Sequence, residues 1–393
     1  MPLIEAICAQ HDELTAWRRD FHKHPELGYQ EERTAGLVAE RLRQFGCDDV
    51  ITGMAGTGVV GVIHGKEAGK GDGVGLRADM DALPIVEETG LPYASIHQGK
   101  MHACGHDGHT TMLLGAARYL AATRDFAGTV YAIFQPAEEG GAGGERMVQE
   151  GLFARFPMRE IYGMHNWPGH PVGTFAAIAG PMMAAVDTFD ITLAGRGGHA
   201  AMPQDTIDPI IAATHLVQAL NTIIARNVRA SDQAVVSVTQ IHAGDAFNVI
   251  PASAIVRGTV RTYDPTTREA IEERIRHMIT GVDATFGVSG TLRYWRGYPP
   301  TVNSEAETAF ALRVASEIVG DTHIDTNISP SMGGEDFAYM LSERPGCYIR
   351  VGNGPASGGR QLHSPQFDFN DEILPYGASY WARLAERALP LSA

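Results

Sequence analysis

The chain has 393 residues, of which 44% are hydrophobic and 20% are charged, a composition typical of a soluble globular protein. A chain of this length exceeds what one hydrophobic core usually covers, so two domains are expected. Its formal net charge of -15 argues against nucleic acid or an anionic membrane surface as a partner.

The cysteines and the N-terminus indicate the cellular location of the protein. Four cysteines are spaced too widely for a disulfide framework, which indicates a reducing cytosol with free thiols. The first residues lack the basic and apolar segments of a signal peptide. No apolar run reaches the roughly 18 residues that a membrane span needs. The sequence therefore predicts a cytoplasmic protein with no membrane partner.

The first elements alternate between helix and strand. Ala35, Val38 and Leu42 recur at helical spacing and predict a helix over residues 31–45 that stops at Gly46. Apolar runs bounded by glycine predict buried strands over residues 58–63, 73–78 and 128–134, and a helix follows residue 106. This order predicts an α/β fold with a mixed, largely parallel sheet, whose ligands bind just beyond the strand ends.

The middle of the chain has a different pattern. Strands are expected at residues 189–193, 234–241, 254–261 and 292–295, with helices at 207–225 and 265–280. This order is typical of a small α+β sandwich inserted into the larger domain. The predicted catalytic domain comprises residues 1–182 and 297–393, and the inserted domain comprises residues 183–296.

A dense cluster of metal-ligand side chains lies in the run 101–109. Cys104 and His106 stand two residues apart, so one loop can direct both at a divalent ion. Further candidates follow at Glu138 and Glu139, at His165 and at His363. A thiolate, neutral imidazoles and a carboxylate suit zinc or a neighbouring transition metal.

Adjacent Glu138 and Glu139 point in different directions, so one can bind metal while the other acts as general base on an activated water. The glycine-rich run 140–144 that follows lets the backbone approach a ligand closely.

Four other polar residues have candidate roles. Asp81, like Asp79, can accept the second N–H of a metal-bound imidazole. His199, in a glycine-rich turn, can donate to a developing oxyanion. Arg261 can bind a carboxylate in bidentate fashion, and Asn248 can hydrogen-bond a substrate amide or carboxylate.

Taken together, these motifs resemble the M20 family of metallopeptidases, in its branch of N-acyl-amino-acid amidohydrolases that includes hippurate hydrolase and the auxin-conjugate hydrolases. The similarity covers the whole chain in order. The matching runs are Phe21–Gly28, Arg77–Pro84, Met101–His109, Phe134–Gly140, Gly163–Asn166, Gly197–Ala200, Phe247–Pro251 and Met332–Phe337.

The resemblance implies two divalent metal ions per subunit, with Cys104 as the bridge. His106 and His165 would hold one ion, and Glu139 and His363 the other. It further implies that Glu138 is the general base, and that Asn248 and Arg261 hold the substrate carboxylate. His199 would reach from the inserted domain, a lid and dimerisation domain, into the active site of its partner in a homodimer or a larger assembly.

The predicted activity is hydrolysis of an N-acyl amino acid to a carboxylic acid and a free amino acid. The acyl group stays open among acetyl, benzoyl, indolyl-acetyl and short peptidyl groups. The metal is zinc or manganese, with nickel or cobalt as alternatives. Three other hypotheses are a di- or carboxypeptidase of the same family, a silent amino-acid or peptide binder, and an enzyme with Cys104 as nucleophile and His106 or His109 as base.

Overall fold

A computed structural model describes residues 3–68 and 73–392 of the chain. An eight-stranded sheet runs in the order β1-β2-β4-β3-β5-β16-β6-β15. The central neighbours β4, β3, β5 and β16 run parallel, whereas β1–β2 and β2–β4 pair antiparallel. The predicted mixed, largely parallel α/β sheet is therefore confirmed. Its strands are β1 (Asp49–Met54), β2 (Gly58–His64), β3 (Gly73–Asp79), β4 (Thr129–Gln135), β5 (Glu160–Trp167), β6 (Phe175–Ala176), β15 (Ile324–Asp325) and β16 (Gly346–Gly352).

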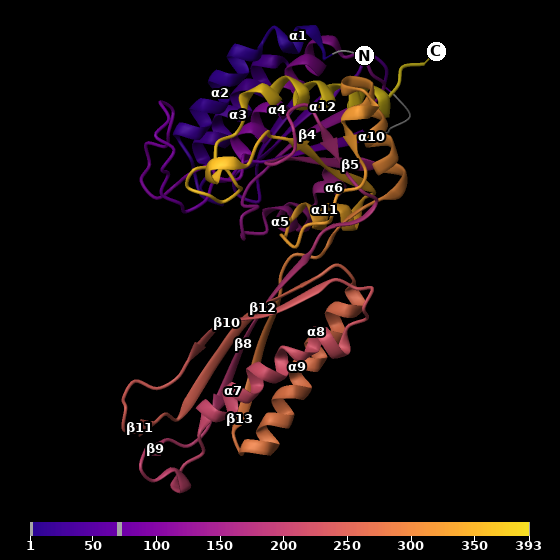
Figure 1. Cartoon of the computed structure of the whole chain (residues 1–393). Coiled ribbons are helices and arrows are strands. Elements are labelled where there is room, and N and C mark those ends of the chain that lie inside the picture. The colour runs from indigo at the N-terminus through magenta and orange to yellow at the C-terminus, as the bar shows by residue number, and fades with distance from the viewer. Residues whose placement is uncertain (1–2, 69–72, 393) are drawn as a thin grey trace. The chain divides into compact units, whose positions relative to one another are not determined.

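Helices cover both faces of this sheet, which is why every residue of β3 and β16 is buried. In Figure 1, α4 and α12 lie on one side of the sheet, and α5, α6 and α11 lie on the other. The helices of this unit are α1 (Glu5–Cys8), α2 (His11–Lys23), α3 (Glu32–Phe45), α4 (His106–Thr123), α5 (Gly143–Gln149), α6 (Leu152–Arg155), α10 (Glu305–Val319), α11 (Phe337–Glu343) and α12 (Leu374–Ala388).

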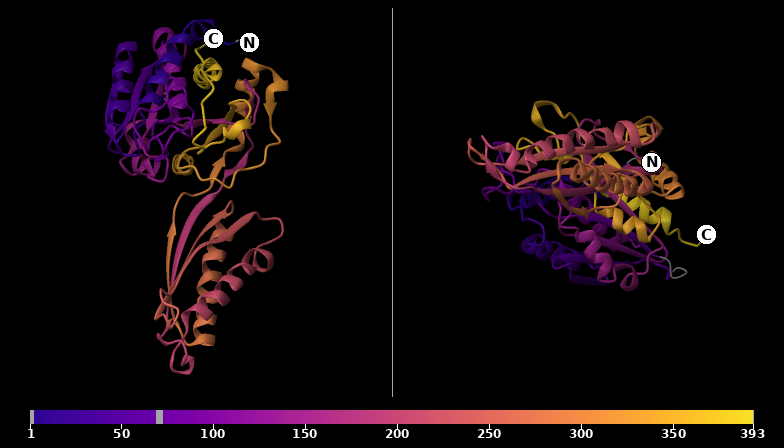
Figure 2. Two further views of the ribbon diagram at one scale, coloured as in Figure 1. Left: turned by 60° about the vertical axis from the view of Figure 1, so that its left-hand side comes forward. Right: turned by 90° about the horizontal axis from the view of Figure 1, so that it is seen from below.

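A separate four-stranded antiparallel sheet has the order β10-β12-β8-β13. In β8 buried and more exposed residues alternate, because helices cover only one face of the sheet. The views in Figure 2 show its two long helices side by side along that face. The elements are β8 (Ala185–Ala194), β9 (Gly198–His199), α7 (Pro209–Leu220), α8 (Thr222–Asn227), β10 (Ala234–His242), β11 (Val249–Ile250), β12 (Ser253–Thr262), α9 (Pro265–Phe286) and β13 (Ser289–Arg296).

The chain forms two compact units, each with its own hydrophobic core. The first comprises Met1–Met182, Val302–Ser329 and Asp336–Ala393, and the second comprises Met183–Thr301 and Pro330–Glu335. The chain passes between them within β7 (Gly180–Met183) and β14 (Thr301–Asn303), and again after Ser329 and after Glu335. No helix among the described residues is long and apolar enough to cross a membrane.

Two predicted helices differ from the observed ones at their ends. The helix expected over residues 207–225 is broken at Asn221, whose side-chain amide donates to the carbonyl of Val217 at 2.8 Å. The helix expected over 265–280 continues to Phe286, where Gly287 adopts φ +74° and ends it. The helix at Glu32–Phe45 ends at Gly46 as expected.

Candidate metal centre

The predicted metal ligands of the first unit come from the carboxyl ends of its central parallel strands. His165 lies on β5, and the pair Glu138 and Glu139 follows β4. Cys104 and His106 flank Gly105 at the start of α4. Gly105 has φ +100°, and a Cβ there would lie 2.2 Å from Oδ1 of Asn166, so the tight approach requires glycine.

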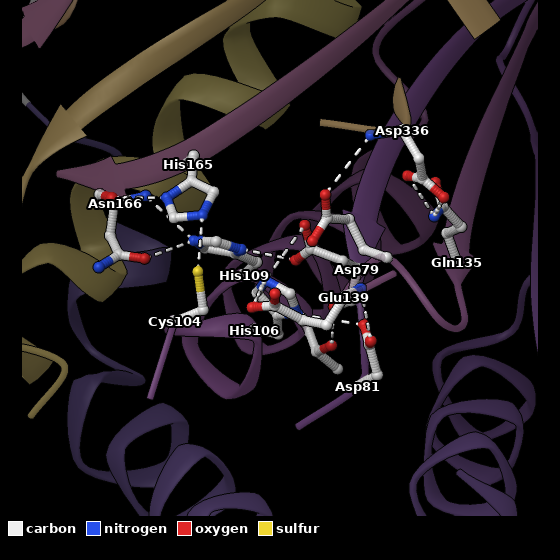
Figure 3. A network of polar contacts seen from close by, with 12 residues as sticks. Asp79, Asp81, Cys104, His106, His109, Gln135, Glu139, His165, Asn166 and Asp336 are labelled. Carbon is white, nitrogen blue, oxygen red and sulfur yellow. Dashed lines mark hydrogen bonds and ion pairs between the residues drawn. The ribbon is translucent and has the colours of Figure 1, made fainter. Parts of the chain in front are cut away.

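The ligand atoms of these residues form two groups that share Cys104. The atoms of Cys104, His106 and His165 lie within 4.8 Å of one another, and so do those of Cys104, Glu139 and His363. Sγ of Cys104 is 3.3 Å from Nε2 of His165, and Nε2 of His363 is 3.1 Å from Oε1 of Glu139. The close-up in Figure 3 shows Cys104, His106, Glu139 and His165 converging.

The two groups differ in burial. The first consists entirely of buried residues, whereas the side chain of His363 in the second is 54% exposed. His363 also has a left-handed backbone, with φ +64°, and its N–H donates to the carbonyl of Ala103 at 2.7 Å. One side of the centre is therefore enclosed by protein and the other faces solvent.

The surroundings of His106 test whether the donor set fits a cation. Its Nδ1 is 3.2 Å from Oδ1 of Asp81, while its buried Nε2 has no hydrogen-bond partner among the described residues. Oε1 of Glu139 lies 4.0 Å from that nitrogen, too far for a hydrogen bond. A divalent ion would satisfy these converging groups, so the donor set fits a metal centre.

The pKa shifts follow from burial and from the surrounding carboxylates. Despite complete burial, Asp79 and Asp81 raise the pKa of His106 to about 10. Burial, together with Glu139 and Glu138, raises the pKa of the Cys104 thiol well above its ordinary value. Burial, followed by the charge of His109, lowers the pKa of His165 well below its usual range. Without a cation the thiol therefore keeps its proton, and a bound metal would favour the thiolate.

Glu138 lies beside the two ligand groups. Its carboxylate is buried, and one oxygen lies within 4.8 Å of ligand atoms of His106 and Glu139. Oε1 accepts a long hydrogen bond of 3.4 Å from the backbone N–H of Asp336. The two adjacent glutamates therefore have different neighbours. Glu139 belongs to the ligand group with Cys104 and His363, whereas Glu138 does not.

A buried polar network borders the ligands, and Figure 3 labels its members Asp79, His109, Gln135, Asn166 and Asp336. Arg77 donates to Gln135, to Asp79 at 2.8 Å and to Asp336 at 3.0 Å. The carboxylate of Asp79 also pairs with His109, whose other nitrogen meets Asn166. No role follows from the sequence alone for Arg77, Gln135, Asn166 or Asp336. The available signal is that all four lie inside the matched motifs.

His199, Asn248 and Arg261 belong to the second unit. The first two are brought together, because β9 and β11 pair His199 with Val249, and the N–H of Ala200 donates to the carbonyl of Asn248 at 3.0 Å. Both side chains are exposed. Arg261 lies at the other end of β12, eight residues beyond Ser253 and therefore about 26 Å along the strand.

The chain matches one family model and several known proteins. Residues 75–387 match the model described as Peptidase family M20/M25/M40. The hippurate hydrolase of Campylobacter jejuni is 40% identical over 99% of this chain and 100% of its own length. An N-acetylcysteine deacetylase of Bacillus subtilis is 39% identical, with 96% of this chain and 97% of the relative covered.

Solved structures extend the likeness to the fold. The YXEP protein of Bacillus subtilis, described as a dinuclear metal-binding peptidase of the M20 family, superposes with a TM-score of 0.84. The two chains are 36% identical, and the match covers 97% of this chain and 99% of that one.

Proposed function

Because this chain belongs to Peptidase family M20/M25/M40, we propose that it is a metal-dependent amidohydrolase that cleaves the amide bond of N-acyl amino acids. The products are a carboxylic acid and a free amino acid. Two relatives with nearly full coverage support this substrate class, since hippurate and N-acetylcysteine are both N-acyl amino acids.

The observation that carries the proposal is the pair of ligand groups sharing Cys104, with the carboxylate of Glu138 beside them. We assign one ion to Cys104, His106 and His165. We assign a second ion to Cys104, Glu139 and His363. The thiolate favours zinc, and manganese, nickel or cobalt are the alternatives that availability decides. When bound, such ions supply positive charge that lowers the pKa of water and polarises an amide carbonyl.

Glu138 is the general base in this proposal. Its carboxylate takes a proton from the attacking water at one Oε atom and delivers it to the departing nitrogen of the amide. The water oxygen bonds to the acyl carbon and gives a tetrahedral oxyanion, and the carbon–nitrogen bond breaks when this species collapses and the nitrogen takes the proton from Glu138. Asp81 fixes the ring of His106 through Nδ1, which leaves Nε2 for metal.

We assign substrate contacts to the second unit, the lid and dimerisation domain of the proposal. His199 donates to the carbonyl oxygen, and Asn248 and Arg261 bind the substrate carboxylate. One small substrate cannot span the length of β12 between Asn248 and Arg261. This separation supports a homodimer in which His199 and Asn248 of one subunit and Arg261 of the other serve the same active site.

The dimer surface is supported by exposed apolar side chains at one end of the second unit. Met202, Ile241 and Val249 are about half exposed, and Phe247 is fully exposed. Strand β10 lies at the edge of its sheet and can pair with a second copy. Light scattering at micromolar concentration tests the dimer, and a monomer would remove the proposed contribution of His199 in trans.

Two alternatives are weaker. A nucleophilic cysteine needs a lowered pKa, whereas burial raises the pKa of Cys104. A silent binder has no need for the buried carboxylate of Glu138 beside a set of metal ligands. We also propose a cytoplasmic location, since the four cysteines are free in the structure. Cell fractionation tests that location.

The first experiment measures release of free amino acid from N-acetyl, N-benzoyl and N-indolyl-acetyl amino acids, with dipeptides alongside. It uses metal-stripped protein, before and after addition of zinc, manganese, nickel or cobalt. We expect metal-restored hydrolysis of N-acyl amino acids. Cleavage of dipeptides alone would make the protein a peptidase, and silence with every metal would overturn the proposed hydrolase.

A further inference from the structure

The segment from Glu26 to Glu31 takes no part in the proposed chemistry, yet it touches the loop that carries Glu138 and Glu139. We call residues 26–31 the brace and residues 136–144 the base loop. The hydroxyl of Tyr29 donates to the carbonyl of Gly141 at 2.6 Å. A Cβ on Gly28 would lie 3.0 Å from Cβ of Ala137, so the two backbones are in close contact. The brace therefore packs directly against the base loop.

The brace also makes a polar contact with Ala137, the residue before Glu138. Ala137 is fully buried and has φ +53°, a left-handed conformation that is strained for a residue with a Cβ. Its N–H donates to Oε1 of Glu31 at 2.8 Å. Such a conformation persists only where surrounding contacts hold it, and this hydrogen bond is one of them.

Glu31 is itself fixed. Its side chain is fully buried, and Oε2 accepts a hydrogen bond of 2.7 Å from the hydroxyl of Thr57 on the other side. Burial raises the pKa of Glu31, while these two donors oppose that shift. Burying a carboxylate is costly, and two short hydrogen bonds offset only part of that cost. The residue that contacts the base loop is therefore one whose burial destabilises the fold, which indicates that its contact has a use.

Carboxylates hold the base loop at two other backbone N–H groups. Asp81 accepts from Glu139 at 2.9 Å, and Asp336 accepts from Gly144 at 2.7 Å. These contacts fix the loop after Glu138, and the contact with Glu31 fixes it before Glu138. The directions in which the two adjacent glutamates leave the backbone therefore depend on the conformation of Ala137.

We propose that Glu31 is a positioning residue for the general base. By accepting the N–H of Ala137, it holds that residue in the left-handed conformation that directs Glu138 toward the reacting atoms and Glu139 toward His363. This inference rests on the function proposed above for Glu138. Displacements of about 1 Å at a reacting group cost up to about a hundredfold in rate, so the hydrogen bond has a measurable effect.

Three substitutions separate reach, charge and volume. Glu31→Gln keeps the oxygen that accepts from Ala137 and loses the charge. Glu31→Asp keeps the charge but is one methylene too short, and Glu31→Met keeps the volume but has no strong acceptor. We expect kcat of Glu31→Gln within about threefold of the native value, and kcat of the other two about tenfold lower or more, with KM nearly unchanged. Glu13→Gln, at a carboxylate that pairs with Arg118 away from the base loop, is the control and should keep kcat.

A second measurement does not depend on activity. Hydrogen–deuterium exchange of the peptide containing Ala137 should be slow in the native chain and in Glu31→Gln, and fast in Glu31→Asp and Glu31→Met. Equal kcat in all variants, or a Glu31→Asp enzyme more active than Glu31→Gln, would overturn the positioning role. If the native chain hydrolyses no N-acyl amino acid, the proposed function fails, whereas the exchange data still decide whether Glu31 holds the loop.

Discussion

The metal centre of the first unit and the His199–Asn248 segment of the second unit are built in opposite ways. His106 is buried and held by Asp81 at 3.2 Å, and Cys104 and His165 are buried beside it. His199 is exposed. Among the described residues, the one hydrogen bond of its ring is accepted from the N–H of Ala201 at 3.1 Å. Contacts within the chain hold the side chains of the first region, whereas the side chains of the second are open to solvent.

The largest expected effect separates two neighbours at the metal centre. Glu138→Ala should lower kcat by about a thousandfold, because proton transfer is lost, while metal content is retained. Glu139→Ala is the matched variant, and it should lose part of the bound metal. Turnover by the Glu138→Ala enzyme and metal stoichiometry of both variants check this. Substantial activity in Glu138→Ala would remove the general base from the mechanism.

The exposed region should respond in activity without a change in stability. His199→Ala should lower kcat/KM by about a hundredfold and change the free energy of unfolding by less than about 0.5 kcal/mol. When equal amounts of His199→Ala and Glu138→Ala subunits are mixed, half of the dimers are heterodimers with one intact site of two. If His199 acts in trans, about one quarter of native activity should return. No recovery in verified heterodimers would place His199 in its own subunit's site.

Asp81 tests how firmly the buried region is organised. Asp81→Asn should lower metal affinity about tenfold or more, because the ring of His106 and the N–H of Glu139 lose a carboxylate acceptor. Equilibrium dialysis with zinc measures the affinity. Asp20→Asn, at a carboxylate that pairs with Arg33 on the surface, is the control and should bind metal as the native chain does.

The pH dependence of stability tests His22, a buried histidine of the first unit. Despite burial, hydrogen bonds to Asp107 and Glu87 raise the pKa of His22 to about 9. A raised folded-state pKa stabilises the protein fully below the unfolded value of about 6.5, and this contribution of roughly 3 kcal/mol is lost as pH rises through 9. The melting temperature should therefore fall between these values in the native chain. His22→Gln should show a flatter profile, and equal slopes would contradict the assigned pKa.

Local patterns in the sequence predict much of the fold. Apolar runs bounded by glycine predict β2, β3 and β4, and the carboxylates Glu138 and Glu139 follow the end of β4. Helix bounds are less predictable, since the helix expected over 207–225 is interrupted at Asn221, whose side chain donates to the carbonyl of Val217. The two carboxylates Glu138 and Glu139 are visible in the sequence, but their separate surroundings are not.

The sequence by itself determines which residues face a core and which lie at strand ends. Both depend on the pattern of neighbouring residues in the chain. Only the tertiary structure decides that Glu31 meets Ala137 and that Arg77 meets Asp336. Glu31 and Ala137 are 106 positions apart in the sequence, and Arg77 and Asp336 are 259 positions apart. No local periodicity encodes such a pair, since it depends on how distant elements pack.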